Sequence, residues 1–138
     1  MIFKQLRQNI DVKDAVFNEI YPPSIQAVAE KHWTPVAVAK MAAEYLVEKP
    51  GKKVLDIGAG AGKFCLVGAA STTGLFYGVE QRSSLTKISR KIADRHNITN
   101  VEFINSNINE INFSDYEAFY FFNSFFENID TSSPIDST

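Results

Sequence analysis

Residues 54–62 have the sequence Val-Leu-Asp-Ile-Gly-Ala-Gly-Ala-Gly, and this stretch decides the fold. The short apolar run at residues 54–57 is typical of a buried strand, and residues 63–70 are expected to form a helix. The three glycines between them predict a turn that side chains would block. A strand, a glycine turn and a helix N-terminus together let a ligand approach backbone N–H groups at the carboxyl end of the strand, where open α/β sheets bind their ligands.

The segments after this turn alternate between strand and helix patterns. We expect strands at residues 75–79, 101–104 and 118–122, and a helix at residues 84–96 with its apolar residues on one face. Residues 105–117 are polar and predict a single helical turn. Strands that alternate with helices imply a parallel sheet with right-handed crossovers.

The first half of the chain has helical patterns only. Residues 11–20 and 25–31 are expected to be short helices, because apolar residues recur there at helical spacing. Thr34 and Pro35 predict the start of a third helix, since Thr caps helices well and Pro suits the first helical position. The chain should therefore have three parts, which are a helical segment at residues 1–50 that packs on or caps the ligand cleft, a core at residues 51–130 and a polar tail at residues 131–138.

The composition indicates one globular domain, because 138 residues with 45% hydrophobic side chains suffice for a core. A net charge of -2 gives no basic field that would attract nucleic acid. No stretch resembles a signal peptide or reaches the roughly 18 apolar residues of a membrane span. We expect a cytoplasmic protein without a membrane partner. The single cysteine, Cys65, is expected to be a buried reduced thiol, and no CxxC motif or histidine cluster suggests a metal site.

The glycine spacing differs from the G-x-G-x-x-G fingerprint of dinucleotide-binding proteins. Lys63 stands where the third glycine of that fingerprint would fall. Asp56, two residues before the first glycine, would repel a phosphate and attract an ammonium group. The turn therefore favours a cationic nucleoside that carries an amino acid over a pyrophosphate.

The pattern Asp-x-Gly-x-Gly-x-Gly after a strand, with an acid at the end of the next strand, resembles the class I S-adenosylmethionine-dependent methyltransferases. The resemblance covers roughly residues 50–123. It implies a Rossmann-like three-layer sandwich, with a parallel sheet of about four strands in the order 3-2-1-4 and N-terminal helices. It also implies S-adenosyl-L-methionine as the cofactor, bound at the turn by Asp56, Gly58, Ala59, Gly60 and Gly62.

Two further stretches resemble motifs of this family. Phe-Tyr-Gly-Val-Glu at residues 76–80 resembles the second motif, whose acid receives both ribose hydroxyls, and Glu80 follows Gly58 by 22 residues. Gln81 and Arg82 stand where family members often wall the adenine. Asn107 replaces the usual Asp that accepts from the adenine amine, and the N–H of Ile108 would meet the adenine ring. The residue pattern leaves alternatives open, namely glycines needed only for packing, Glu80 as a solvated strand end and Asn107 as an ordinary turn residue.

The end of the fourth strand is where many family members place the residues that meet the methyl acceptor. Amino-group methyltransferases have a pattern like Asn-Pro-Pro-Tyr there, and this chain has Asn123 and Phe125 without the prolines. Asn123 is thus a candidate catalytic residue, or else a strand-end residue. A loose similarity to some protein-lysine methyltransferases also slightly favours an amine acceptor, which stays unidentified.

The expected function is methyl transfer from S-adenosylmethionine by in-line displacement. Two other readings stay open, a non-catalytic S-adenosylmethionine- or nucleotide-binding module and a nicotinamide oxidoreductase, although Asp56 argues against the latter. Family members usually continue for three more strands, so we expect a chain truncated after the fourth strand or the cofactor-binding part of a longer protein. If the chain is complete, its aromatic-rich fourth strand, an edge, should pair with a second copy.

Overall fold

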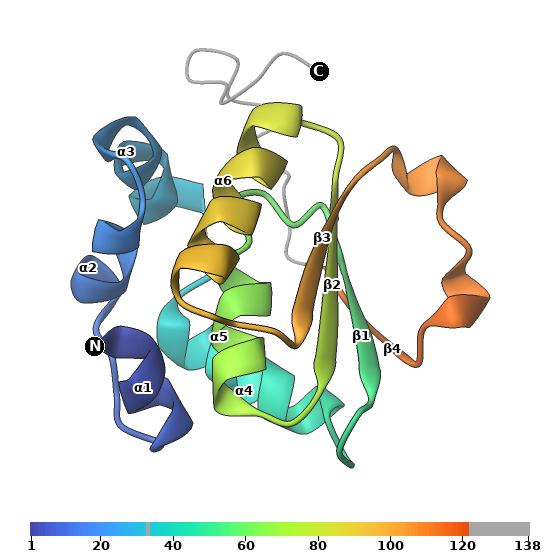
Figure 1. The fold of residues 1–138 in the computed structure, drawn as a ribbon, viewed down its shortest axis with the longest axis horizontal. Helices are drawn as coiled ribbons and strands as arrows, with labels where there is room; N and C mark the ends of the chain where they lie inside the picture. Colours follow the sequence, from blue (N-terminus) through green and yellow to red (C-terminus); the bar gives the residue numbers. More distant parts are fainter. Residues whose placement is uncertain (33, 122–138) are drawn as a thin grey trace.

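The computed structural model describes residues 1–32 and 34–121, and it places a four-stranded parallel sheet at the centre of the molecule (Figure 1). The strands are β1 (Lys53–Ile57), β2 (Leu75–Glu80), β3 (Val101–Asn105) and β4 (Ala118–Tyr120). Their order is β3-β2-β1-β4, so the predicted order 3-2-1-4 and the Rossmann-like class are confirmed.

Helices α5 (Lys63–Ser71) and α6 (Ser83–Arg95) form the two crossovers between the first three strands. Together with α4 (Val36–Leu46) they lie on one side of the sheet in Figure 1. The opposite side carries the segment between β3 and β4. This segment contains two 3-10 turns, η2 (Ile108–Glu110) and η3 (Phe113–Asp115), where the sequence predicted a single helical turn.

The N-terminal segment is helical as expected, but its elements differ in detail. The predicted helix at residues 11–20 is α2 (Asp14–Phe17) continued by the 3-10 turn η1 (Asn18–Ile20), and α3 (Pro23–His32) follows. A further helix, α1 (Ile2–Arg7), was not predicted. It buries Phe3 and Leu6, and the Phe3 ring meets Phe17 edge to face at 5.8 Å.

The start of α4 corrects one prediction. Thr34 does not cap this helix, because Pro35 holds the capping position and makes no side-chain cap. The Thr34 hydroxyl instead lies 2.9 Å from the Tyr120 hydroxyl at the end of β4. Asp14 takes over the capping role from α2, since its Oδ1 accepts the N–H of Val36 at 2.8 Å. A residue far away in the sequence thus satisfies a donor at the helix start that has no partner within the helix.

The hydrophobic core lies between the helices and the sheet. Its fully buried side chains include Phe76 on β2 and Leu66 on α5, and Phe103 on β3 is 5% exposed. Each such side chain contributes about 1.5–3 kcal/mol when it leaves water. This packed layer holds β1, β2 and α5 in fixed positions, and therefore also the glycine turn that joins β1 to α5.

Of the helices in the described residues, none combines the length and the apolar character that crossing a bilayer requires.

Candidate functional site

The glycine turn between β1 and α5 has open space at the Cβ positions of its first two glycines. Gly58, Gly60 and Gly62 all have positive φ angles, +72°, +60° and +84°, which favour glycine. A Cβ on Gly58 or Gly60 would meet nothing within 4 Å, whereas a Cβ on Gly62 would lie 2.7 Å from the Phe103 ring. Packing therefore accounts for Gly62, while the open space beside Gly58, which is exposed, and Gly60, which is buried, leaves room for a ligand.

The backbone donors of this turn are engaged inside the protein. Gly58 and Ala59 donate to the carbonyl of Val79 at 3.0 and 2.9 Å, Gly60 donates to Glu80 Oε1 at 2.9 Å, and Gly62 donates to the carbonyl of Ala59 at 3.0 Å. A ligand at the turn would therefore find the N–H groups of these four residues already paired. Since a pyrophosphate relies on such donors, the turn offers it little.

Asp56 lies on β1, buried to 4% exposure, between Gly78 and Tyr120 of the neighbouring strands. Burial raises the pKa of its carboxyl group to about 8, although the Cys65 hydrogen bond lowers it; the nearby Glu80 raises it further. Within residues 1–32 and 34–121, the one hydrogen-bond donor that reaches Asp56 is the Cys65 thiol, at 3.7 Å. The predicted buried thiol is confirmed. A cationic partner would favour the charged carboxylate.

Glu80 ends β2 and is also 4% exposed. Its Oε1 accepts from the Gly60 N–H at 2.9 Å and from Arg82 Nη2 at 3.2 Å. Its Oε2 accepts from the N–H of Arg82 at 2.9 Å and from Arg82 Nε at 2.7 Å. Burial alone would raise the pKa of Glu80, but the hydrogen bonds and charge of Arg82 hold it below the usual value. Glu80 is thus a charged, fully bonded carboxylate and not a solvated strand end.

The remaining predicted cofactor residues follow the carboxyl ends of β2 and β3, at the same edge of the sheet as Asp56 and Glu80. Gln81 is exposed directly after β2. Asn107 is exposed and caps η2, because its Oδ1 accepts the N–H of Asn109 at 2.9 Å. Ile108 is half-buried at the start of η2. The candidate acceptor residue Asn123 lies outside the described residues.

Several residues at this edge were not predicted from the sequence. The Tyr21 hydroxyl donates to the carbonyl of Ala61 inside the glycine turn at 2.9 Å. Lys63, the first residue of α5, is 5% exposed and pairs with Asp14 at 2.7 Å. The pKa of Lys63 is lowered by burial, which Asp14 opposes. The N-terminal segment therefore contacts both the glycine turn and the first residue of α5. In the sequence, the one indication of this contact was a lysine at the start of an otherwise mostly apolar helix.

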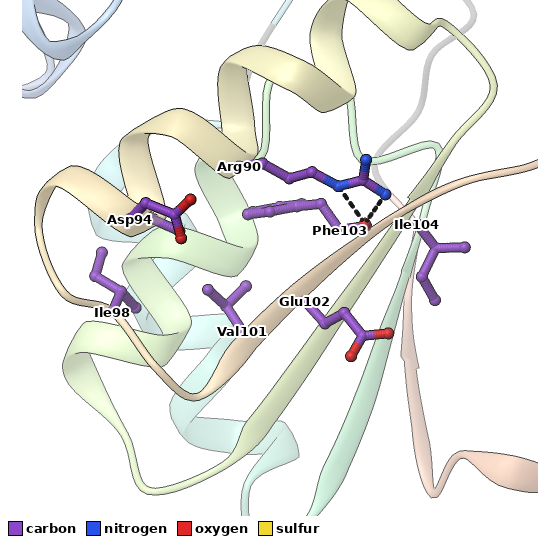
Figure 2. A pocket seen from close by; sticks show the side chains of 8 residues that line it. Arg90, Asp94, Ile98, Val101, Glu102, Phe103 and Ile104 are labelled. Atoms are coloured by element: carbon purple, nitrogen blue, oxygen red, sulfur yellow. Dashed lines mark hydrogen bonds between the residues drawn. The ribbon is translucent and has the colours of Figure 1, made fainter.

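A cavity of about 420 Å³ lies at the outer edge of the sheet, between α6 and β3. Figure 2 shows that Arg90 reaches from α6 to the strand, where its Nε and Nη2 donate to the carbonyl of Phe103 at 3.0 and 2.8 Å. This contact covers a backbone acceptor of an edge strand. No predicted site residue lines the cavity, so it is separate from the glycine turn.

The comparisons with known proteins agree with this geometry. A family model described as "Methyltransferase domain" matches residues 48–131. The fold is similar to the YcgJ protein of Bacillus subtilis, with a TM-score of 0.56, 18% identity, and coverage of 69% of this chain and 41% of that one. It is also similar to a SAM-dependent O-methyltransferase of Thermotoga maritima, with a TM-score of 0.57, 21% identity, and coverage of 72% and 40%.

A putative S-adenosyl-L-methionine-dependent methyltransferase of Methanococcus maripaludis is similar over 95% of this chain and 55% of its own, with a TM-score of 0.59 and 14% identity. No curated protein matches the chain. The chain spans about two fifths of the length of the first two of these solved structures. The family model covers more than half of the chain, the glycine turn included, and the sheet order fits. The chain therefore belongs to the methyltransferase-domain family.

Proposed function

We propose that this chain binds S-adenosylmethionine and forms the cofactor side of a methyltransferase. The observation that carries the proposal is the pair of buried carboxylates, Asp56 and Glu80, at the carboxyl ends of neighbouring strands beside an open glycine turn. An acid at each of these positions suits a ligand with a cationic amino-acid part and a ribose. The N–H groups of Gly58, Ala59, Gly60 and Gly62 are already paired within the protein, which argues against a pyrophosphate in the same place.

The residues present fit the cofactor at its amino-acid end. Asp56 is buried beside a thiol donor and has no cationic partner among the described residues. The ammonium group of the ligand would be that partner. The open backbone of Gly58 and Gly60 leaves room for the ligand chain to pass. Asp56 would therefore hold the ammonium group of the cofactor, and the glycines would allow its close approach.

The nucleoside end is assigned to the next strands. Glu80 would accept the ribose hydroxyls, while Gln81, Asn107 and Ile108 would line the adenine. These residues lie along the carboxyl ends of β2 and β3, and Asn105 links the two strand ends by donating from Nδ2 to the carbonyl of Glu80 at 2.9 Å. The order of the strands thus matches the order of the parts of the cofactor.

S-adenosylmethionine supplies a methyl group on a sulfonium, whose departure leaves a neutral thioether. The protein therefore needs little acid–base chemistry, and its residues act by holding the methyl donor in one orientation and by excluding water. Asp56 and Glu80 fix the two ends of the donor.

We propose an amine as the acceptor, protein lysine included. The support is the resemblance of Asn123 and Phe125 to the acceptor motif of amino-group methyltransferases. The test is a transfer assay with radiolabelled S-adenosylmethionine on free amines, hydroxyl compounds and lysine-containing proteins. Label in the amine or lysine fraction supports this acceptor, and label found only in hydroxyl compounds contradicts it. Binding without transfer to any acceptor favours the second candidate, a cofactor-binding module or the cofactor-binding part of a longer protein, because the chain spans two fifths of the first two similar structures.

Calorimetric titration tests the cofactor assignment. We expect S-adenosylhomocysteine to bind the wild-type chain, and NAD to bind far more weakly. Asp56→Asn and Glu80→Gln each replace a carboxyl group by an amide of nearly the same size, which cannot pair with the ligand as an anion, so each should weaken binding at least about tenfold, as expected for a lost charge-assisted hydrogen bond. Asp94→Asn is the matched control, since Asp94 is exposed on α6 and away from the turn. Unchanged affinity in both site variants, or a preference for NAD, would refute the assignment.

A further inference from the structure

Glu80 has no free acceptor position left in this structure. A carboxylate offers about four lone-pair sites, two on each oxygen. Each oxygen of Glu80 accepts one backbone N–H, from Gly60 or from Arg82, at 2.9 Å in both cases. Each oxygen also accepts one guanidinium N–H of Arg82, Nη2 at 3.2 Å on Oε1 and Nε at 2.7 Å on Oε2. Two ribose hydroxyls that donate to Glu80 would find these positions taken.

The two kinds of donor differ in how easily they can leave. The backbone N–H groups belong to the glycine turn and to the strand end, so they stay with the fold. The guanidinium lies at the end of a long side chain on the connection between β2 and α6, where Arg82 precedes the helix. Arg82 belongs to neither β2 nor α6, so its side chain, which is 13% exposed, can leave by rotation about its own bonds. Its departure frees one position on each carboxylate oxygen, which matches the two hydroxyl donors of a ribose diol.

We propose that the Arg82 guanidinium occupies the ribose position on Glu80 in the free protein and competes with the cofactor for it. This inference rests on the proposed function of Glu80 and adds a regulatory contact to it. Arg82 keeps a buried carboxylate charged and paired while no ligand is bound. The ligand must then displace the guanidinium, while the backbone donors of Gly60 and Arg82 keep Glu80 in place.

The size of the effect follows from the fraction of free protein molecules in which the Arg82 guanidinium is bound to Glu80. If the guanidinium holds Glu80 in about 90% of the molecules, the apparent affinity for a ribose ligand falls about tenfold. Removing the guanidinium should therefore tighten binding, which is the opposite of what loss of a cofactor-binding residue would do. The effect should also depend on the diol, because only the hydroxyl groups compete with the guanidinium.

The experiment is calorimetric titration of the wild-type chain, Arg82→Ala and Arg95→Ala with S-adenosylhomocysteine, followed by adenosine and 2′,3′-dideoxyadenosine as competing ligands. Arg95 lies exposed in the last turn of α6, the helix that Arg82 precedes, and its replacement by alanine makes the same change of charge. We expect Arg82→Ala to bind S-adenosylhomocysteine and adenosine about three- to tenfold more tightly than the wild type. Arg95→Ala should equal the wild type, and dideoxyadenosine should bind equally to all three proteins.

Weaker or unchanged binding of S-adenosylhomocysteine by Arg82→Ala would overturn the competition while leaving the proposed function intact. Equal tightening for adenosine and dideoxyadenosine would overturn it as well, because the diol would then have no part. Should no folded form of the chain bind S-adenosylhomocysteine, the proposed function itself fails. Arg82→Lys gives a second measure if the alanine variant does not fold. It keeps the charge but loses the two-pronged contact, so a smaller gain in affinity is expected.

Discussion

Asp56 is a buried acid whose protonation should govern how the stability of the free protein depends on pH. Its pKa is about 8 in the folded chain, against an ordinary value of 3.8, because burial disfavours the charge. At a pH between these two pKa values, the Asp56 carboxyl group therefore keeps its proton in the folded state and has lost it in the unfolded state. The contribution of this residue to stability should be complete below about pH 3.8, and it should fall as the pH rises from there toward 8.

Urea unfolding at intervals from pH 5 to pH 9 measures this effect. The wild type should lose at least about 2 kcal/mol of unfolding free energy across the range, since one pKa unit corresponds to about 1.4 kcal/mol. Asp56→Asn carries no titrating group and should show a flatter profile, while the exposed Asp94→Asn should follow the wild type. The pKa of Glu80 is lowered from 4.5, so its contribution changes below that pH, and the pKa values of Cys65 and Tyr120 are raised from 9.0 and 10.0, so theirs change mainly above pH 9. Equal slopes in wild type and Asp56→Asn would contradict the prediction.

At the scale of elements, an ion pair with one buried member connects the N-terminal helix α2 to α5. Lys63 is 5% exposed at the start of α5, where the helix dipole disfavours a cation, and Asp14 on α2 pairs with it. Asp14→Ala leaves this cation unpaired and also removes the acceptor for the Val36 N–H. Lys63→Met removes the buried charge itself. We therefore expect Asp14→Ala to cost about 1–3 kcal/mol of stability, and more than Lys63→Met costs.

Urea unfolding at pH 7 compares the two variants, with Asp11→Ala as the control, because Asp11 is an exposed acid in the same segment. The double variant Asp14→Ala/Lys63→Met should be more stable than Asp14→Ala alone, since it contains no unpaired buried cation. Lys63→Met being the more damaging single change would show that the lysine stem, and not its charge, provides the stability.

The elements that local patterns determine were predictable, and the contacts that join distant segments were not. The strand, turn and helix at residues 53–71 follow from apolar runs and glycines, and the order of the sheet was implied by the family resemblance. The contacts of Tyr21 with Ala61 and of Asp14 with Lys63 join residues 40 and 49 positions apart, and no spacing rule indicates them. Arg82 is only two positions from Glu80, but whether its side chain turns back onto Glu80 depends on the conformation of the connection to α6. Thr34 was predicted as a cap for the same reason, because its contact with Tyr120 and the contact of Asp14 with Val36 also join distant segments.

For the whole molecule, the described α-helices lie on one side of the sheet, and the other side carries only the 3-10 turns η2 and η3 among the described helical elements (Figure 1). On the other side, Phe119 of β4 lies next to Leu55 in register, and Leu55 next to Tyr77. Phe119 is 44% exposed and its ring meets Phe113, which is exposed to the same extent. Within the described residues, β4 pairs with β1 alone, so its other edge has no strand partner there. An aromatic face beside an edge strand is a surface on which protein chains associate.

We therefore expect this chain of 138 residues to self-associate through β4 and the aromatic face beside it. Sedimentation velocity over a range of roughly 5 to 500 µM should show a species heavier than the monomer that grows with concentration, as mass action requires. Phe119→Lys places a charge on the face and should shift the population toward monomer. Val38→Lys adds the same charge at an exposed position of α4, on the opposite side of the sheet, and should leave the association unchanged. A wild-type monomer at every concentration, or equal effects of the two lysines, would show that β4 is not the contact.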